Sequence, residues 1–363
     1  MFMTIFGVAG SIAMLFTGYA VQSSIANINQ RQFTQLLKYD LIVAENDYVS
    51  DKDREDLDNR LKNESIAGHT SIHYEDLHQK TLDKQEKQDI KLLVPTQADL
   101  SDYVCLQNRS TGEKIDLSDE GIVISERLAH ALNAKVGDTV TFEEDDKHSF
   151  EAKVTGITEM YMGHFVFTTP KGYEQMVGKD MDENAHWVQL KDRSIANTES
   201  TAAYFMESSA VSGVIQNTML INQVQTIVEA LDKIMTVLII IASLLGIVIL
   251  YNLTNLNVAE RIRELSTIKV LGFYDKEVTL YIYRETFLLT IIGIFVGYGI
   301  GELLHRYILE VVPPTDVMFD PALKFKTFLI PAFIILVVTA ILAKIIHQKL
   351  KVIDMLEALK SVE

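Results

Sequence analysis

Four long stretches of this sequence contain no Asp, Glu, Lys or Arg, and they constrain the fold more than any other feature. They cover residues 1–30, 234–259, 286–301 and 327–343. Crossing the hydrocarbon core of a bilayer takes about 20 apolar residues, with a lower limit of about 17. The last two stretches reach that length once their flanks are included, with Arg284, Glu285 and Lys344 near the membrane interface. The sequence therefore predicts a membrane α-helical fold with four transmembrane helices.

These helices fix the order of the remaining segments. We predict transmembrane helices at 1–21, 228–256, 279–303 and 327–347, an inserted α+β domain at 22–227, a helical elbow at 257–278, a short loop at 304–326 and a tail at 348–363. The first helix lacks the basic leader of a cleaved signal peptide, so we expect it to be retained. It also begins without a basic lead-in, and we expect the chain to correspond to the second part of a longer protein. Two lobes are expected in the α+β domain, because the sequence pattern of residues 44–115 differs from that of the later part of the domain.

The distribution of Lys and Arg predicts the orientation in the membrane. The elbow and the segment from residue 344 onwards carry Arg261, Arg263, Lys269, Lys276, Lys344, Lys349, Lys351 and Lys360, whereas the short loop carries Arg306, Lys324 and Lys326. Short cytoplasmic segments are enriched in basic residues. We therefore expect the elbow and both termini to be cytoplasmic and the α+β domain to be extracytoplasmic.

The α+β domain is acidic. Between residues 22 and 227 there are 20 Lys or Arg against 35 Asp or Glu. This excludes the basic footprint of a nucleic-acid-binding protein, and it disfavours flat binding to an anionic lipid surface. The chain has one cysteine, Cys105, so neither an intramolecular disulfide nor a cysteine-based zinc cluster is possible. A large outer domain without disulfides fits a bacterium that does not rely on them.

Local patterns predict the elements of this domain. The segment "YDLIV" at 39–43 is typical of a strand, and "DKDREDLDNRL" is typical of a helix capped by Ser50 or Asp51. "GIVISERLAHALN" predicts a strand, an N-cap at Ser125 and a short helix. "VGDTVTFEE" and "SFEAKVTGIT" alternate in polarity and predict a hairpin across residues 145–148. "HFVFTT" and "HWVQL" predict two further strands, and "NTESTAAYFMES" predicts a capped helix.

Sequence motifs give little support for catalysis. His69, His73 and His78 lie beside Glu75 and Asp76, and the first two have the i, i+4 spacing of metal ligands on a helix. Gly68, Thr70 and Ser71 weaken a helix there, so a solvated histidine-rich surface is favoured over a metal site. The chain contains neither a nucleophile elbow nor a phosphate-binding Gly-x-x-x-x-Gly-Lys-Ser/Thr loop. We expect no enzymatic activity and no cofactor, with any energy supplied by another chain.

The elbow sequence, "NVAERIRELSTIKVLGFYDKEV", predicts an amphipathic helix. Apolar residues fall on one face at positions 258, 262, 265 and 268, and charged residues cover the other. Gly272 stands where a glycine would end this helix, and Asp275 is a possible cap for the next one. A helix continuous with the second transmembrane helix would transmit force. An interfacial helix that only fixes the topology is the alternative on these residues alone.

Glycines of the third transmembrane helix form a second pattern. Gly293, Gly297 and Gly301 recur every four residues. Such a row allows two helices to pack closely, and we expect it to face either the four-helix unit or a sister module. Arg284 and Glu285 are interpreted as interfacial anchors, with a buried functional pair as the alternative.

The elbow, followed by "YIYRETFLLTIIGIFVGYGIG", resembles the FtsX-like permease family of ABC transporters, which includes the MacB-type systems. "MLFTGYAVQSSI", "GIVISERLAHALNAKVGDTVTF" and "KLKVIDMLEALKSVE" resemble its first span, outer core domain and tail. The resemblance implies that the elbow contacts a separate ABC ATPase. It further implies pairing with a second permease module or a second copy, and transmission of motion to outer proteins or lipids. The match is to the C-terminal module of long two-module permeases of Gram-positive bacteria.

If the resemblance holds, two groups of elbow residues serve the contact with the ATPase. Charged side chains that would pair with it are Glu260, Arg261, Arg263, Glu264 and Lys269, and Leu271, Gly272 and Phe273 would shape the elbow. A membrane-anchored sensor of peptides or envelope stress, acting without an ATPase, is the alternative function. An ectoenzyme is disfavoured by the missing catalytic motifs.

Overall fold

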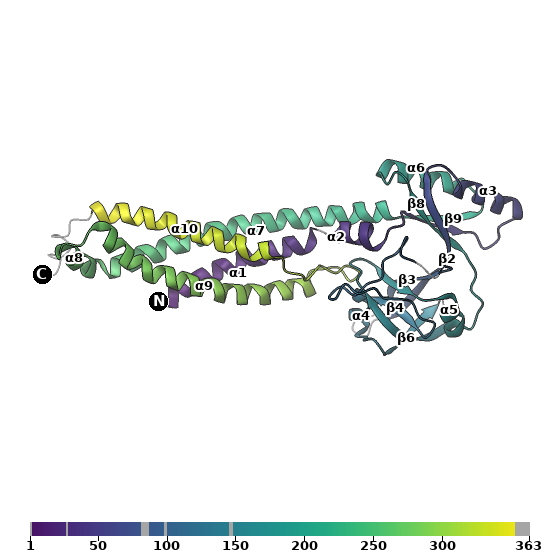
Figure 1. The fold of residues 1–363 in the computed structure, drawn as a ribbon, viewed down its shortest axis with the longest axis horizontal. Helices are drawn as coiled ribbons and strands as arrows, with labels where there is room; N and C mark the ends of the chain where they lie inside the picture. The colour runs from purple at the N-terminus through teal and green to yellow at the C-terminus, as the bar shows by residue number, and fades with distance from the viewer. Residues whose placement is uncertain (1, 27, 81–86, 98–99, 145–147, 353–363) are drawn as a thin grey trace. The chain divides into compact units, whose positions relative to one another are not determined.

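The computed structural model describes residues 2–26, 28–80, 87–97, 100–144 and 148–352 (Figure 1). The chain divides into two compact units. The helical unit comprises residues 2–26, 228–312 and 321–352, and the α+β domain comprises residues 28–227 and 313–320. Residues 353–363 of the predicted tail lie outside the described part.

The helical unit is built from long apolar helices. They are α1 (Phe2–Ile25), α7 (Asn217–Glu260), α9 (Asp275–Val311) and α10 (Phe325–Val352), with the short α8 (Ile262–Val270) between α7 and α9. Among the described residues, four helical stretches are long and apolar enough to cross a membrane, namely Phe2–Leu36, Val228–Glu260, Tyr283–Val311 and Phe325–Gln348. The predicted fold class, four membrane helices with an α+β domain, is confirmed.

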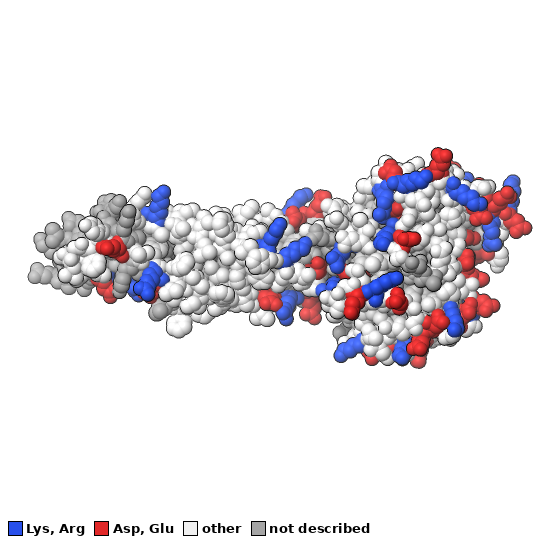
Figure 2. All heavy atoms as spheres, viewed as in Figure 1, with Lys and Arg blue, Asp and Glu red and all other residues white. Residues whose placement is uncertain are grey.

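Helix α1 forms the centre of this unit. Its apolar window is 67% buried, against 22%, 33% and 28% for the three later spans. Val8, Ile12 and Leu15 of α1 form one core with residues of α7, α9 and α10. The other helices turn Ile, Leu, Val and Phe side chains outward, and Figure 2 shows an uncharged surface along their middle. Such a surface suits contact with lipid rather than water.

All four long helices extend beyond the predicted spans, and α7 and α9 extend furthest. Helix α7 begins at Asn217, and its first turns belong to the α+β domain. Helix α9 continues to Val311 instead of ending at residue 303. The extensions include Leu, Met, Gln and Arg, which favour a helix without requiring a membrane. A hydropathy pattern marks only the apolar part of such helices.

A nine-stranded sheet organises the α+β domain, in the order β3-β7-β4-β6-β5-β2-β8-β1-β9. Its strands are β1 (Leu41–Glu45), β2 (Ile66–Lys80), β3 (Lys87–Pro95), β4 (Ile122–Ser125), β5 (Thr139–Glu144), β6 (His148–Thr158), β7 (His164–Phe167), β8 (Ala185–Leu190) and β9 (Val211–Gln216). Strand β2 also pairs with β3, so the strands from β2 to β7 close into a ring. The predicted hairpin is present as β5 and β6, although residues 145–147 lie outside the described part.

Two hydrophobic cores share this sheet. One is built by strands of the ring with α4 (Glu126–Leu132) and α5 (Pro170–Val177), and the other by β1, β8 and β9 with α3 (Asp51–Leu61) and α6 (Ile195–Met206). The long strand β2 contributes Leu77 to the first core and Ile66 to the second. Each core contains residues from both sides of position 115. The boundary between the two cores therefore does not fall at residue 115 of the sequence.

Caps explain several helix boundaries. Ser50 accepts a hydrogen bond from the backbone N–H of Asp53, as predicted for the start of α3. Thr169 and Ser194 cap α5 and α6 in the same way. Ser125 occupies the N-cap position of α4, but its hydroxyl instead accepts a hydrogen bond from Phe165 N–H at 3.1 Å. That bond ties α4 to the start of β7.

Candidate functional site

The elbow consists of two helix ends and a glycine turn. Helix α7 ends at Glu260, Arg261 forms a turn, and α8 follows. The predicted helix continuous with the membrane span is therefore broken at Arg261. Gly272 adopts a φ of +98°, which L-residues with a side chain rarely take, and this reverses the chain after α8. The N-cap of α9 is Tyr274, not Asp275, and the Glu277 carboxylate accepts its N–H at 2.9 Å.

The apolar face of the elbow packs against the membrane helices. Leu265 of α8 is buried in a cluster with Val278 and Tyr283 of α9 and Ile346 of α10. Val258 and Ile268 pack partly against the same cluster. The amphipathic pattern of the sequence therefore corresponds to a helix seated on the ends of two others.

The opposite side of the elbow exposes an apolar patch, which we define as Val270, Leu271, Phe273 and Tyr274. Leu271 is 72% exposed and Phe273 is 52% exposed. Glu260 and Glu264 are also exposed. The side chains of Arg263 and Lys269 lie outside the described part. Large apolar side chains gathered beside charged ones are typical of a protein-binding surface.

Arg261 does not share that exposure. Its guanidinium forms two contacts with the Glu285 carboxylate of α9, at 2.5 and 3.0 Å, and both side chains are about one-third exposed. Glu285, interpreted as an interfacial anchor, also ties the break at Arg261 to α9. Arg261 is held within the chain rather than left for a partner.

The three spaced glycines of α9 lie against α1. A Cβ at Gly293 would stand 2.8 Å from Val8, one at Gly297 would stand 2.7 Å from Ile12, and one at Gly301 would stand 2.8 Å from Phe16. The close approach also allows the Thr17 hydroxyl to donate to the Gly301 carbonyl at 3.1 Å. This row therefore seats α1 on α9 inside the unit.

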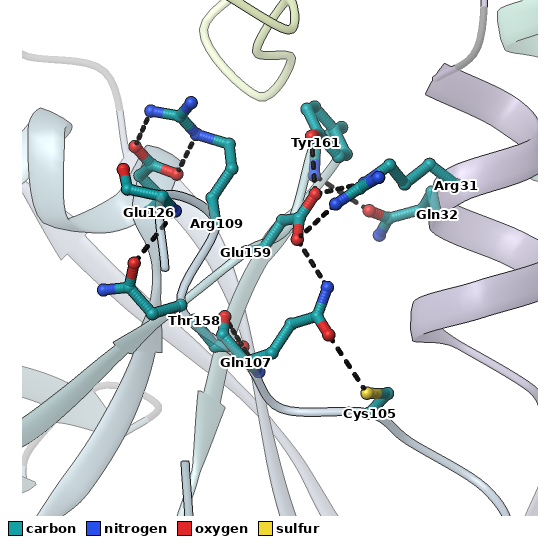
Figure 3. Close-up of polar contacts among 11 residues, drawn as sticks. Arg31, Gln32, Cys105, Gln107, Arg109, Glu126, Thr158, Glu159 and Tyr161 are labelled. Atoms are coloured by element: carbon teal, nitrogen blue, oxygen red, sulfur yellow. Dashed lines mark hydrogen bonds and ion pairs between the residues drawn. The ribbon is translucent and has the colours of Figure 1, made fainter. Parts of the chain in front are cut away.

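A second candidate site, which we call the polar junction, lies in the α+β domain and centres on Glu159 (Figure 3). Its carboxylate is fully buried and accepts hydrogen bonds from three side chains. Arg31 donates at 2.5 and 3.1 Å, the Tyr161 hydroxyl at 2.6 Å and Gln107 at 2.7 Å. Burial alone would raise the pKa of Glu159, but these hydrogen bonds outweigh it and lower the pKa.

The junction also ties the π-helical turn that follows α1 and α2 to the rest of the domain. After α1, the chain passes through the short α2 (Ile28–Gln30) into a π-helical turn, η1 (Arg31–Leu36). The buried amide of Gln32 accepts from Tyr161 N–H at 2.8 Å and donates to the Met162 carbonyl at 3.1 Å. Arg31 and Gln32 therefore clamp η1 onto the segment 159–162. Widened turns of this kind are frequent at functional sites.

The loop between α9 and α10 joins the same segment from another direction. Residues 313–320 belong to the α+β domain. Met318 N–H donates to the Tyr161 carbonyl at 2.7 Å, and Gly163 N–H donates to the Asp316 carbonyl at 2.8 Å. Arg127 of α4 donates to the Thr315 carbonyl at 2.8 Å. Residues 313–320 of the predicted short loop 304–326 are thus hydrogen-bonded into the domain.

The start of α7 is fixed in the domain as well. Asn217 donates from its side chain to the Tyr39 carbonyl at 2.5 Å and from its backbone to Asp40 at 3.0 Å. Asn29 of α2 donates to Gln225 of α7 at 2.9 Å. Every chain connection between the described parts of the two units therefore ends in hydrogen bonds within the α+β domain.

A groove of about 530 Å³ lies beside the junction. Arg109 and Glu126 line it and pair through two hydrogen bonds of 2.8 and 2.9 Å. The Glu126 contact raises the pKa of Arg109, so the guanidinium stays charged. His130 and Lys135 add polar groups to the lining. The mixture of charges would suit a small polar ligand or a peptide segment.

The histidine cluster lies on a strand instead of a helix. His69 and His73 lie on β2, where His73 is buried and its Nδ1 lies 2.7 Å from the Asp182 carbonyl. The solvated surface predicted for this cluster is therefore wrong for His73. Within the described ranges, no group of three His, Cys, Asp or Glu residues is placed to hold a metal ion.

Comparison with known proteins gives two family matches. The model described as FtsX-like permease C-terminal matches residues 236–348, and the model described as MacB-like periplasmic core domain matches residues 1–204, more than half of the chain. A comparison with curated proteins found no match.

Solved structures similar to this chain come from the same group. The periplasmic region of MacB from Actinobacillus actinomycetemcomitans is 9% identical, covering 53% of this chain and 95% of that one with a TM-score of 0.29. The extracellular domain of the non-canonical ABC-type transporter YknZ from Gram-positive bacteria is 13% identical, covering 49% and 98% with a TM-score of 0.26.

Proposed function

Because this chain belongs to the family of MacB-like and FtsX-like permeases, we propose that it is the permease module of an ABC transporter driven by a separate ATPase. The exposed apolar patch of the elbow is the observation that carries this proposal. Exposed apolar patches mark sites of contact with a protein or a membrane, and the exposed carboxylates of Glu260 and Glu264 on the same elbow favour a protein partner. An ATPase docked there would act on α8, which packs directly on α9 and α10.

The proposal includes an orientation. The elbow and both termini face the cytoplasm, and the α+β domain lies outside the cell membrane. The excess of basic residues on the elbow side supports this orientation. Membership of the family implies pairing, so a second permease module or a second copy completes the assembly.

Movement at the elbow would reach the α+β domain through the membrane helices. The break at Arg261 would let α8 tilt against α7, while the Arg261–Glu285 pair ties the residue at the break to α9. The hydrogen-bonded η1, the start of α7 and the loop 313–320 would pass the motion to the rest of the domain. Export of a substrate and transmission of motion to an outer partner are both served by this arrangement.

Co-purification with the ABC ATPase encoded beside this chain tests the proposal. The test variant carries Leu271→Ser and Phe273→Ser together with Glu260→Lys and Glu264→Lys, all at exposed positions. The control exchanges Glu302 and Arg306, an exposed ion pair at the other end of α9. We expect the wild type and the control to retain the ATPase and the elbow variant to lose it.

Failure of all three proteins to retain the ATPase, though each is folded in membranes, would contradict the proposal. A sensor would then be favoured, with the groove beside Arg109 as its ligand site. Direct binding of a peptide to the ATPase-free chain would support that second function.

A further inference from the structure

A groove of about 700 Å³ lies on the surface of the helical unit between α9 and α10. Helix α9 contributes Leu280, Tyr283, Arg284, Phe287 and Leu288, and helix α10 contributes Leu336, Thr339, Ala340 and Ala343. Both sets recur at steps of three or four residues, so each forms one face of its helix. The hollow exists because small residues of α10 stand opposite large residues of α9.

The position of the groove determines what can reach it. It lies on two helices that are apolar and long enough to span a membrane, at the ends nearer the elbow. Its walls are apolar apart from Thr339, the Tyr283 hydroxyl and the Arg284 guanidinium. Hydrocarbon chains of the surrounding leaflet are the molecules most available to such a surface.

Two polar features distinguish the groove from ordinary lipid-facing surface. The side chains of Arg284 and of Lys344, next to Ala343, are exposed, and neither makes an ion pair with another described residue. The hydroxyl of Tyr283 is buried without a hydrogen-bond partner in the described part of the chain, and this residue is only 8% exposed. A buried hydroxyl without a partner is costly, and a ligand oxygen would relieve that cost.

We propose that this groove binds a phospholipid with an anionic headgroup, taken from the leaflet on the elbow side. One acyl chain would lie along Phe287, Leu336 and Ala340, where apolar contact stabilises it. The phosphate would sit at the membrane interface between Arg284 and Lys344, since basic residues there attract anionic lipids. An ester or phosphate oxygen would accept a hydrogen bond from the Tyr283 hydroxyl.

Binding there would affect the elbow directly. Tyr283 lines the groove and also packs in the cluster of Leu265, Val278 and Ile346 that seats α8. A bound lipid would therefore steady the residues on which α8 rests. This inference concerns the lipid and stands whether or not an ATPase binds the elbow.

Native mass spectrometry of the full chain, released from detergent, tests the proposal. The protein is titrated with phosphatidylglycerol or phosphatidylcholine, and bound lipids and oligomers are counted in the same spectra. We expect tighter retention of phosphatidylglycerol. Arg284→Gln and Lys344→Gln should each weaken it about fivefold, because a basic residue near an anionic surface contributes about 1 kcal/mol. Arg306→Gln, at the other end of α9, is the matched control and should change nothing.

A groove-filling variant, Ala340→Phe, separates chain binding from headgroup binding. It should lose retention of both lipids, whereas Arg284→Gln should lose only the preference for phosphatidylglycerol without altering the packing. Equal retention of the two lipids by the wild type would overturn the proposal. So would a dimer of the wild type that Ala340→Phe abolishes, because a second copy would then occupy the groove.

Discussion

The elbow and the polar junction each contain an arginine–glutamate pair with a partly exposed arginine, but the two carboxylates lie in different surroundings. At the elbow, Arg261 and Glu285 are each about one-third exposed beside protruding apolar side chains. At the junction, Glu159 is fully buried and accepts hydrogen bonds from Arg31, Tyr161 and Gln107. A pair with both groups partly exposed contributes little and can rearrange, whereas a fully buried carboxylate that accepts several hydrogen bonds holds one geometry. The elbow is thus an exposed surface on which we propose that a partner acts, whereas the junction holds η1 in one geometry on the segment 159–162.

The largest expected effect follows removal of the junction arginine. Arg31→Ala leaves the Glu159 carboxylate buried with neutral donors only, so we expect a loss of about 3 kcal/mol in the free energy of unfolding. Trp187, the single tryptophan, is fully buried in the α+β domain and stacks on Tyr39, so its fluorescence reports the thermal unfolding of that domain.

The control for this measurement is Arg54→Ala. Arg54 is 65% exposed and lies 3.9 Å from Glu45, so its removal should cost less than about 0.5 kcal/mol. Indistinguishable melting temperatures for Arg31→Ala and the wild type would mean that the junction does not stabilise the α+β domain. The contrast between the two pairs would then fail.

A pH effect is expected where the loop 313–320 meets the domain. Burial lowers the pKa of His164 to about 4, opposed by Asp316 and Asp89 and reinforced by Arg127. An unfolded chain binds this proton below about pH 6.5, but the folded chain does not, so stability falls as the pH drops from about 6.5 towards 4. The loss approaches about 3 kcal/mol at about pH 4.

Melting temperatures between about pH 7 and about pH 4.5 test this expectation and avoid the lower range in which Glu159 titrates. His164→Gln should flatten the dependence, while His130→Gln, at an exposed position of α4, should leave it unchanged. An equally steep dependence in His164→Gln would assign the effect to another group.

Within the helical unit, the glycine row forms a close contact between α9 and α1. Gly297→Leu would place a Cβ 2.7 Å from Ile12 and 2.8 Å from the Ala9 carbonyl, and overpacking of this kind costs about 2 kcal/mol. Gly299→Leu is the matched control, because nothing lies within 4 Å of that position. The fraction of monodisperse protein after heating in detergent should fall only for Gly297→Leu. A similar fall for both variants would show that the loss does not come from the contact between α1 and α9, and no fall for Gly297→Leu would show that these helices tolerate separation.

The smallest effect is expected at the elbow pair. Arg261→Ala should change the stability of the helical unit by no more than about 1 kcal/mol, because both side chains remain in contact with solvent. The same heating assay measures it. A loss as large as that of Arg31→Ala in its own assay would erase the difference between the two pairs.

The sequence predicts the membrane helices well because long uncharged stretches such as 286–301 and 327–343 are rare in segments that face water. Capping residues such as Ser50 and the alternation in β5 and β6 are also local signals, and the structure bears them out. The amphipathic pattern locates the elbow. It does not reveal the break at Arg261, because no glycine or proline marks that position and its pairing partner, Glu285, lies in the next long helix.

The junction escapes prediction from the sequence for a similar reason. Arg31 and Glu159 are far apart in the chain, and Gln32 acts through backbone groups that carry no sequence signal. One clue is present. Glu159 is the only charged residue between Lys153 and Lys171, and Arg31 is the first charge of the chain. Isolated charges in uncharged stretches often mark buried, paired groups.

Site-directed cross-linking at the elbow tests the central claim most directly. In a Cys105→Ser background, single cysteines are introduced at Leu271 and, as a control, at Arg306 on the opposite end of α9, and the permease is assembled with its ATPase. We expect a short-range cross-link from Leu271→Cys to the ATPase and none from Arg306→Cys. An intact complex that cross-links from neither position, or equally from both, would contradict the elbow as the point at which the permease is driven.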